Sequence, residues 1–123
     1  WDASRIEQLV SNLIGNAVQH GLHTPVNITL DGNQADTVTV GVLNRGPAIP
    51  EWQRRSIFDP LTRGVDPEAE ADADQRTSLG LGLYIAHEIA SAHGGTIDVV
   101  SSALAGTTFR FVLPRHLPNL RVN

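Results

Sequence analysis

The 123-residue chain contains neither cysteine nor lysine, and each absence narrows what the protein can be. Without cysteine there are no disulfide bonds and no thiolate metal sites. Without lysine, all nine basic residues are arginine. This excludes a phosphate-binding loop that ends in Gly-Lys-Ser/Thr, and also a kinase that depends on an essential strand lysine.

Long apolar runs and an excess of positive charge are missing too. No stretch approaches the roughly 18 apolar residues of a membrane-spanning helix, and no secretory signal peptide is visible. The net charge of −4 argues against nucleic-acid binding. A chain of 123 residues with 41% apolar content is typical of one domain with its own core. Because a helix signal starts within the first few residues, we expect a piece of a longer protein.

Residues 2–21 have the apolar spacing of one amphipathic helix. Asp2 or Ser4 can cap its start, and Gly21 can end it. Asn12 and Asn16 lie four residues apart on another face, so their amides point the same way.

Asparagine is a mediocre helix former, so the pair Asn12 and Asn16 costs helix stability that something else must offset. We interpret the two amides as holding a hydrated cation that carries the phosphates of a nucleotide. The alternative is a pair of solvated amides.

Two alternating apolar runs follow, at residues 26–30 and 38–42, separated by a turn at 31–36. They predict a half-buried β-hairpin. The second strand leads into a glycine- and proline-rich loop at 44–50. Asn44 could present its amide to the edge of a base, and Gly46 would let the flat face of a ligand approach the backbone. A plain strand exit is the alternative.

A short helix is expected from residue 51 to about 58. Phe58 could line a pocket and Arg63 could reach a phosphate, although a single aromatic residue more often belongs to a core. Residues 64–78 carry five acidic side chains without apolar periodicity. A loop of this length is usually a lid, and solubilising disorder is the alternative.

Gly80 and Gly82 are expected to open a second long helix, which Gly94 and Gly95 stop. Unpaired N–H groups at such a helix start suit a phosphate. Alternation at 97–100 and 106–113 predicts a closing hairpin. The fold class is then α+β, a two-layer sandwich in which helices cover one face of a mainly antiparallel sheet. One domain would span residues 1–114, with the lid at about 64–78 and a tail at 115–123.

Taken in order, these blocks resemble the catalytic and ATP-binding domain of sensor histidine kinases. That domain belongs to the wider Bergerat-fold superfamily, with gyrase, chaperone ATPases and mismatch-repair proteins. Residues 12–20 are similar to its N box, and residues 44–50 to its first glycine box. Residues 57–61 are similar to the F box. Residues 80–85 with 92–95 are similar to the second glycine box, and 106–109 to the last. The match covers about residues 2 to 114.

The resemblance implies roles for individual residues. Asn16, assisted by Asn12, would ligate Mg²⁺, and His20 would lie near the phosphates of ATP. Asn44 would contact the adenine amino group, with a water shared with Thr107. The other nucleotide-binding positions would be Gly46, Ala48, Ile49, Phe58, Arg63, Gly80, Leu81, Gly82 and Leu83.

The chain departs from the usual pattern at three positions. Asn44 stands where the first glycine box usually begins with Asp, so the charge-assisted bond to adenine is lost. Ala48 replaces that box's second glycine, and Gln19 stands where a Lys is common. Phosphate charge would then be met by Mg²⁺, the helix start and Arg63 or Arg76. One branch of sensor kinases, which includes phytochrome-like ones, resembles this variant, so an active enzyme is still expected.

Asn12 also bears on the chemistry. Related ATPases need a carboxylate base at this position to activate water, so the resemblance favours transfer over hydrolysis. The γ-phosphoryl group would pass to a histidine on a separate dimerisation and phosphoacceptor domain, and then to a response regulator in a two-component system. His87-Glu88 lacks the residues that follow a phosphoacceptor histidine, so the chain alone should bind ATP without autophosphorylation.

Two alternatives stay open. One is a protein-serine kinase of the anti-sigma-factor type, which shares the fold. The other is a non-catalytic nucleotide-responsive module, consistent with Asn44, Gln19 and Ala48. In each case we expect a cytoplasmic domain without membrane or nucleic-acid contact, whether the full-length protein is soluble or membrane-anchored.

Overall fold

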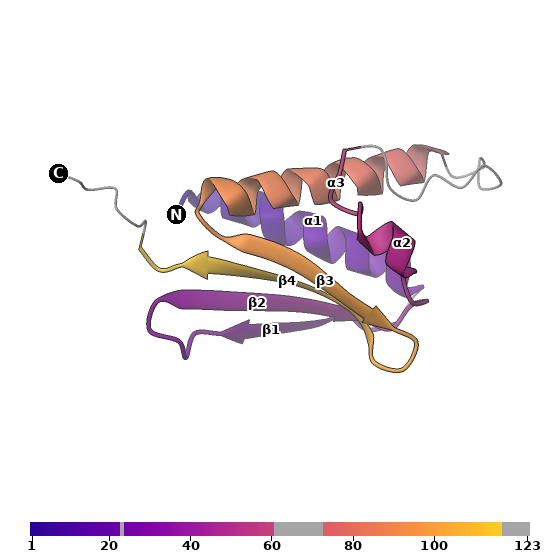
Figure 1. Cartoon of the computed structure of the whole chain (residues 1–123), viewed down its shortest axis with the longest axis horizontal. Helices are drawn as coiled ribbons and strands as arrows, with labels where there is room; N and C mark the ends of the chain where they lie inside the picture. Colours follow the sequence, from indigo (N-terminus) through magenta and orange to yellow (C-terminus); the bar gives the residue numbers. More distant parts are fainter. Residues whose placement is uncertain (23, 61–72, 117–123) are drawn as a thin grey trace.

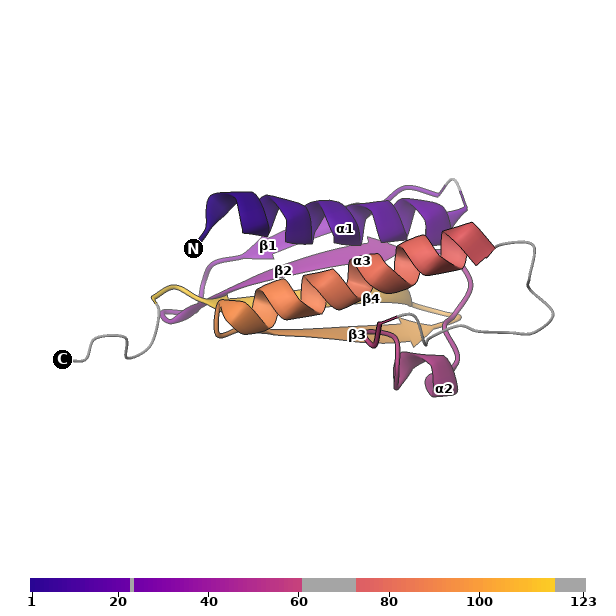
Figure 2. The same ribbon diagram turned by 90° about the horizontal axis from the view of Figure 1, so that it is seen from above.

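The computed structural model describes residues 1–22, 24–60 and 73–116, with the side chains of its last long helix described from Leu81 onward. In this part of the chain the element order is α1 (Ala3–Gly21), β1 (Asn27–Asp31), β2 (Thr37–Asn44), α2 (Glu51–Arg54), α3 (Ala73–Ala92), β3 (Thr96–Ser102) and β4 (Gly106–Pro114). All neighbouring strands are antiparallel, in the order β1-β2-β4-β3. Helices α1 and α3 lie side by side over one face of the sheet (Figures 1 and 2). The predicted two-layer α+β sandwich is confirmed.

The core lies between the two long helices and the sheet. The strand register places Val42 opposite Phe109 and Val40 opposite Phe111, so these side chains line up on the helix-facing side. Burial of each large apolar side chain contributes about 1.5–3 kcal/mol. The buried apolar residues are Leu9, Leu13, Ala17, Val42, Ile49, Ile57, Leu83, Ala86, Ile89, Phe109, Phe111 and Leu113.

Hydrogen bonds at one end of the molecule join the start of α1 to the end of α3. The Asp2 carboxylate accepts the backbone N–H groups of Ser4 and Arg5, at 3.1 and 3.3 Å. These bonds, that of Arg5 foremost, lower the pKa of Asp2 and make it the helix cap. The Asp2 N–H donates to His93 Nε2 at 3.1 Å, while His93 Nδ1 donates to the Ile89 carbonyl at 2.8 Å. The two bonds together place the proton of the neutral His93 ring on Nδ1.

The boundary between α1 and the first strand differs from expectation. Gly21 is the last residue of α1, but the left-handed residue that ends the helix is Leu22, with φ of 53°. Gly21 lies against the end of β2, where an added Cβ would be 3.3 Å from Asn44 Cβ. Its small size therefore serves the packing of helix on strand.

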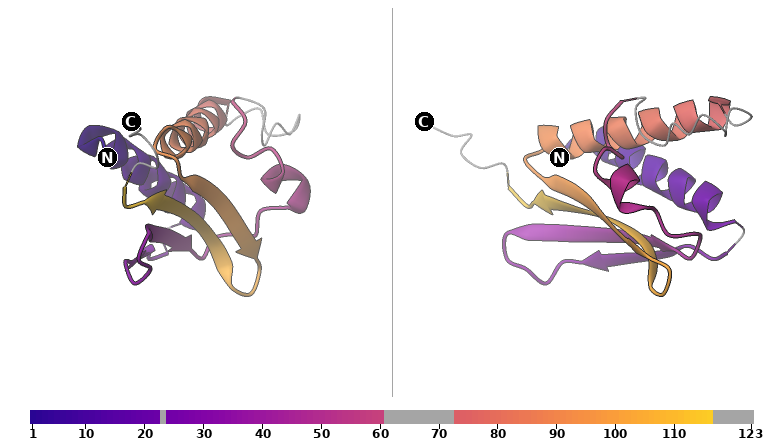
Figure 3. Two further views of the ribbon diagram at one scale, coloured as in Figure 1. Left: turned by 60° about the vertical axis from the view of Figure 1, so that its left-hand side comes forward. Right: turned by 45° about the vertical axis from the view of Figure 1, so that its right-hand side comes forward.

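Strand β1 is not half-buried as predicted. All five of its residues are exposed, with Ile28 at 52% and Leu30 at 73%. The predicted strand is present, and its apolar residues Ile28 and Leu30 pair with Val42 and Val40 of β2. However, β1 is an edge strand at the rim of the sheet (Figure 3), and neither long helix packs closely against it.

The start of α3 also differs. The helix begins at Ala73 instead of Gly80, so residues 73–78 of the predicted lid are helical. Residues 64–72 of that lid, together with Arg63, lie outside the described residues. Each glycine inside a helix costs only about 1 kcal/mol relative to alanine, so Gly80 and Gly82 alone are weak helix boundaries.

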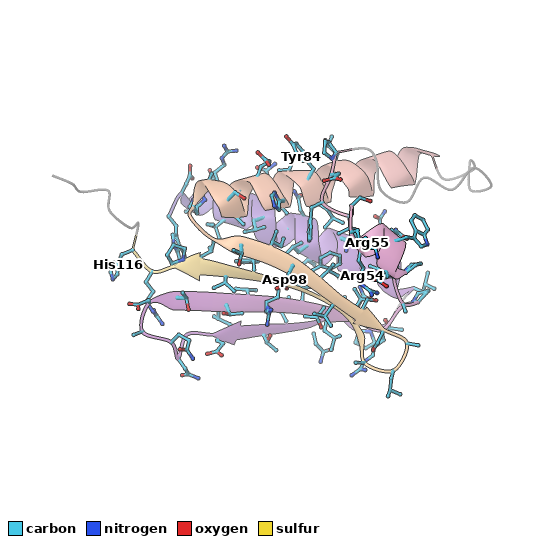
Figure 4. The ribbon with its side chains drawn as sticks, in the orientation of Figure 1. Arg54, Arg55, Tyr84, Asp98 and His116 are labelled. Carbon is cyan, nitrogen blue, oxygen red and sulfur yellow. The ribbon has the colours of Figure 1, made fainter. Side chains whose placement is uncertain are left out.

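A second apolar region lies on the other side of α1. A cavity of about 1260 Å³ opens there, and we call it the α1 hollow. Its lining includes Trp1, Ile6, Val10, Ile14, Val38 and His116. The Trp1 indole N–H donates to the Pro114 carbonyl at 2.8 Å, and this bond fixes the Trp1 side chain at the side of the hollow. His116, labelled in Figure 4, lies just after the end of β4.

The opposite face of the sheet carries an ion pair between β3 and β4. Arg110 on β4 and Asp98 on β3 are register partners and form an ion pair at 2.8 Å. The hydrogen bond to Asp98, labelled in Figure 4, raises the pKa of Arg110. Within the described residues, none of the helices has both the length and the apolarity of a membrane span.

Candidate functional site

Asn12 and Asn16, which their helical spacing places on one face of α1, line one hollow together with Gly82 of α3. A cavity of about 440 Å³, here called the asparagine groove, is lined by Ser11, Asn12, Gly15, Asn16, Val18, Gln19 and Gly82. The Asn12 Nδ2 donates to the Gly82 carbonyl at 3.1 Å. Because a carbonyl oxygen only accepts, this bond fixes the Asn12 amide and leaves its Oδ1 on the other side. Asn16 is 7% exposed, so its amide is largely removed from bulk water.

The glycine stretch does not form the helix start that was expected to bind phosphate. Gly80 and Gly82 lie in the interior of α3, which begins at Ala73. In a helix interior, each N–H donates to the carbonyl four residues earlier and is not free for an anion. In this conformation the residues at 80–82 contribute the Gly82 carbonyl to the asparagine groove.

His20 and Gly46 connect α1 with the loop after β2. His20 Nε2 donates to the Pro47 carbonyl at 2.7 Å, which pins the loop to the last turn of α1. A Cβ added at Gly46 would lie 1.9 Å from the His20 backbone oxygen. Gly46 therefore has a structural reason to be glycine, close backbone packing, in addition to the predicted approach of a ligand.

Asn44 ends β2 and is completely buried. Its Oδ1 accepts the Gly46 N–H at 3.1 Å, whereas its Nδ2 has no partner among the described residues. Buried polar atoms almost always have a hydrogen-bond partner, so an orphaned donor needs an explanation. Asn44 lines neither the α1 hollow nor the asparagine groove, so the base-binding role that the resemblance implies stays a prediction.

Thr107 is buried next to Asn44, and the strand register pairs the two. Thr107 Oγ1 lies 2.6 Å from Ser101 Oγ, and Ser101 Oγ accepts the Ile49 N–H at 2.8 Å. The Arg54 guanidinium, labelled in Figure 4, donates to the carbonyls of Ile49 and Ser101. These bonds connect the first and last glycine boxes.

Sequence reasoning missed Ser101 and Arg54. Ser101 could have been found, because it continues the alternation that starts at Ile97 and ends opposite Thr107. Arg54 gives no such signal, since its contact with β3 depends on how the short α2 packs in three dimensions.

The remaining predicted positions divide between core and surface. Ile49 and Leu83 are core residues, at 4% and 1% exposed. The centroid of the Phe58 ring lies 5.8 Å from that of His87 and 6.1 Å, edge to face, from that of Phe109. Phe58 therefore packs against the core, which is the alternative to lining a pocket. Ala48 and Leu81 are exposed.

A sequence profile of one family, described as histidine kinase-, DNA gyrase B-, and HSP90-like ATPase, matches residues 1–117. The chain belongs to this family. Among relatives of this ATPase domain, a bacteriophytochrome of Pseudomonas aeruginosa is 41% identical over 99 residues, 80% of the chain and 13% of that protein. Sensor protein RstB of Escherichia coli is 36% identical over 115 residues, 92% of the chain and 25% of that protein. The ATPase domain therefore spans a quarter or less of these curated relatives.

Solved structures agree with this assignment. Full-length ShkA in complex with AMPPNP superposes on the ATPase domain with a TM-score of 0.74 at 27% identity, covering 92% of the chain and 22% of ShkA. The catalytic domain of histidine kinase ThkA gives a TM-score of 0.73 at 31% identity, covering 93% of the chain and 67% of that domain. The predicted fold and family are both confirmed.

Proposed function

We propose that the chain is the ATP-binding catalytic domain of a two-component sensor histidine kinase. It would supply the ATP γ-phosphoryl group to a histidine on a separate dimerisation and phosphoacceptor domain, from which a response regulator would receive it. Family membership and relatives named as sensor kinases support this. ShkA, with a similar fold, was solved in complex with AMPPNP. The observation that carries the proposal is the asparagine groove, where Asn12, Asn16 and Gly82 meet.

Mg²⁺ would be held by Asn16 with help from Asn12. Mg²⁺ prefers oxygen ligands, keeps several waters and usually takes only one or two ligands from the protein. The Oδ1 of Asn12 suits this, because the Gly82 carbonyl engages only Nδ2. When bound, the metal would neutralise charge on the phosphates of ATP.

The other residues would position the nucleotide. Asn44 would face the base, and His20, through its bond to Pro47, would hold the loop between the base and phosphate ends of the site. Asn12 cannot act as the carboxylate base that water attack requires, so transfer to a protein acceptor is favoured over hydrolysis. The lid predicted at about 64–78 stays a prediction, because residues 61–72 lie outside the described residues.

A non-catalytic, nucleotide-responsive module is the second candidate. It is favoured by Asn44, Gln19 and Ala48, the three positions at which the chain departs from the usual kinase pattern. Addition of a purified histidine-kinase dimerisation and phosphoacceptor domain, with radiolabelled ATP, separates the two candidates. Label on the acceptor histidine supports the kinase, and nucleotide binding without any transfer supports the module.

Replacement of Asn16 tests the metal site. Asn16→Ala should weaken Mg²⁺-dependent ATP binding at least about tenfold, or about 1.4 kcal/mol, because it removes a metal ligand. The fold should persist, since alanine is the better helix former. Calorimetric titration with Mg²⁺ or with EDTA measures the effect. Asn27→Ala, at an exposed strand position, is the matched control. Equal Mg²⁺ dependence in both variants would remove Asn16 from the metal site.

A further inference from the structure

Gln19 lies in the asparagine groove beside the two asparagines. It follows Asn16 by one turn of α1 and Asn12 by two turns, so the three amides share one face of the helix. Gln19 is exposed, and it lines the same cavity as Asn12 and Asn16. A side chain at position 19 therefore meets whatever ligand the two asparagines hold.

The groove is uncharged wherever the structure describes its lining. That lining consists of amides, a hydroxyl, glycines and a valine, with neither an acidic nor a basic side chain among the described residues. An added Cβ at Gly15 would meet nothing within 4 Å, so this part of the wall is unobstructed. The whole chain has a net charge of −4, so no general positive field attracts an anion to the groove.

An uncharged groove treats a bare ion and an ion complex differently. A free triphosphate would lose hydration there without gaining a cation from these residues. Free Mg²⁺ would also bind poorly, because proteins usually hold this ion through one or two carboxylates. In the Mg²⁺ complex of the triphosphate, part of the charge is already cancelled, and neutral amides can bind both the metal and the phosphate oxygens.

We propose that Gln19 makes the groove specific for the metal–nucleotide complex, so that the chain binds Mg²⁺ and ATP only together. The proposal rests on the proposed function, in which Asn12 and Asn16 hold Mg²⁺ and, through it, the phosphates of ATP. Gln19 is then a specificity-determining residue, because its side chain adds no charge at the place where a cation would bind the free triphosphate.

Titration of the chain with ATP, in Mg²⁺ and in EDTA, measures this specificity. Calorimetry should give a dissociation constant at least about 100-fold weaker in EDTA, because each uncompensated charge near a protein surface is worth more than a factor of ten. Equal affinities in the two buffers would overturn the proposal.

Gln19→Lys tests the role of the residue itself. It should strengthen ATP binding in EDTA at least about tenfold more than it strengthens binding in Mg²⁺, because the ammonium group acts on charge that the metal otherwise cancels. Gln34→Lys is the matched control, since it makes the same charge change in the exposed turn between β1 and β2. Equal effects of the two substitutions would show that position 19 does not set the metal requirement.

A titration with the metal alone needs no folded variant of Gln19. Mg²⁺ added to the chain without nucleotide should give no binding heat at millimolar metal. Binding that is present in the unaltered chain and lost in Asn16→Ala would show that the groove holds bare Mg²⁺, and the proposal would be wrong.

The outcomes separate this inference from the proposed function. If ATP binds neither in Mg²⁺ nor in EDTA, the proposed function fails and the inference fails with it. If ATP binds equally well in both, the chain is still an ATP-binding domain, and only the specificity assigned to Gln19 is lost.

Discussion

At the scale of single residues, Gly46 shows how a position can be constrained by a contact that is distant in sequence. Glycine at 46 was predicted to admit a ligand, yet an added Cβ would also collide with the His20 carbonyl at 1.9 Å. Asn44 is similar, because the sequence singles out the residue but does not predict which way its amide points. Only the bond from Gly46 N–H shows which end of the amide is Oδ1. Sequence patterns identify such residues, but only the three-dimensional contacts show what each side chain binds.

Leu22 offers a test of backbone strain at the same scale. It is 63% exposed and holds φ at 53°, where a side chain costs about 1–2 kcal/mol and glycine costs little. Leu22→Gly should therefore raise the free energy of unfolding by about 0.5–1 kcal/mol, after the entropy of glycine is subtracted. Urea denaturation measures the change. Leu22→Ala removes the same side chain but keeps Cβ, so a gain shared by both variants would contradict strain as the cause.

At the scale of elements, the sequence predicted the helices and strands whose patterns arise from neighbouring residues. The periodicity of α1 and the alternation of β2, β3 and β4 come from burial on one face, and all four elements are found. The start of α3 was placed too late because Gly80 and Gly82 were read as a boundary, although a helix tolerates them. The exposure of β1 depends on its place in the sheet order, which its own alternation does not encode.

The edge position of β1 makes a quantitative prediction. Ile28→Thr and Leu30→Thr should each change the free energy of unfolding by less than about 0.5 kcal/mol, as expected for exposed positions. Val42→Thr is the matched control, because Val42 is the register partner of Ile28 and is fully buried. A hydroxyl placed there should cost about 1–3 kcal/mol. Denaturant titration of the three variants gives the comparison, and equal losses at positions 28 and 42 would mean that the β1 edge is covered in solution.

At the scale of the whole molecule, the order of the blocks along the chain was enough to predict the family and the layered fold. The order alone could not give the polar contacts that join the blocks. His93 fastens the start of α1 to the end of α3, and Ser101 connects the first and last glycine boxes. These bonds join segments that are far apart in sequence, and they arise only when the layers pack together.

The α1 hollow has a consequence for how unfolding of this molecule would be observed. The fluorescence of dyes such as ANS increases when they bind apolar surface. The native state already exposes such a surface in this recess. We expect strong dye emission from the intact chain, well below the temperature at which circular dichroism reports melting. Weak emission in the cold would mean that the recess is closed in solution. A bright signal at the outset would reflect the shape of the folded protein and would not mark a damaged one.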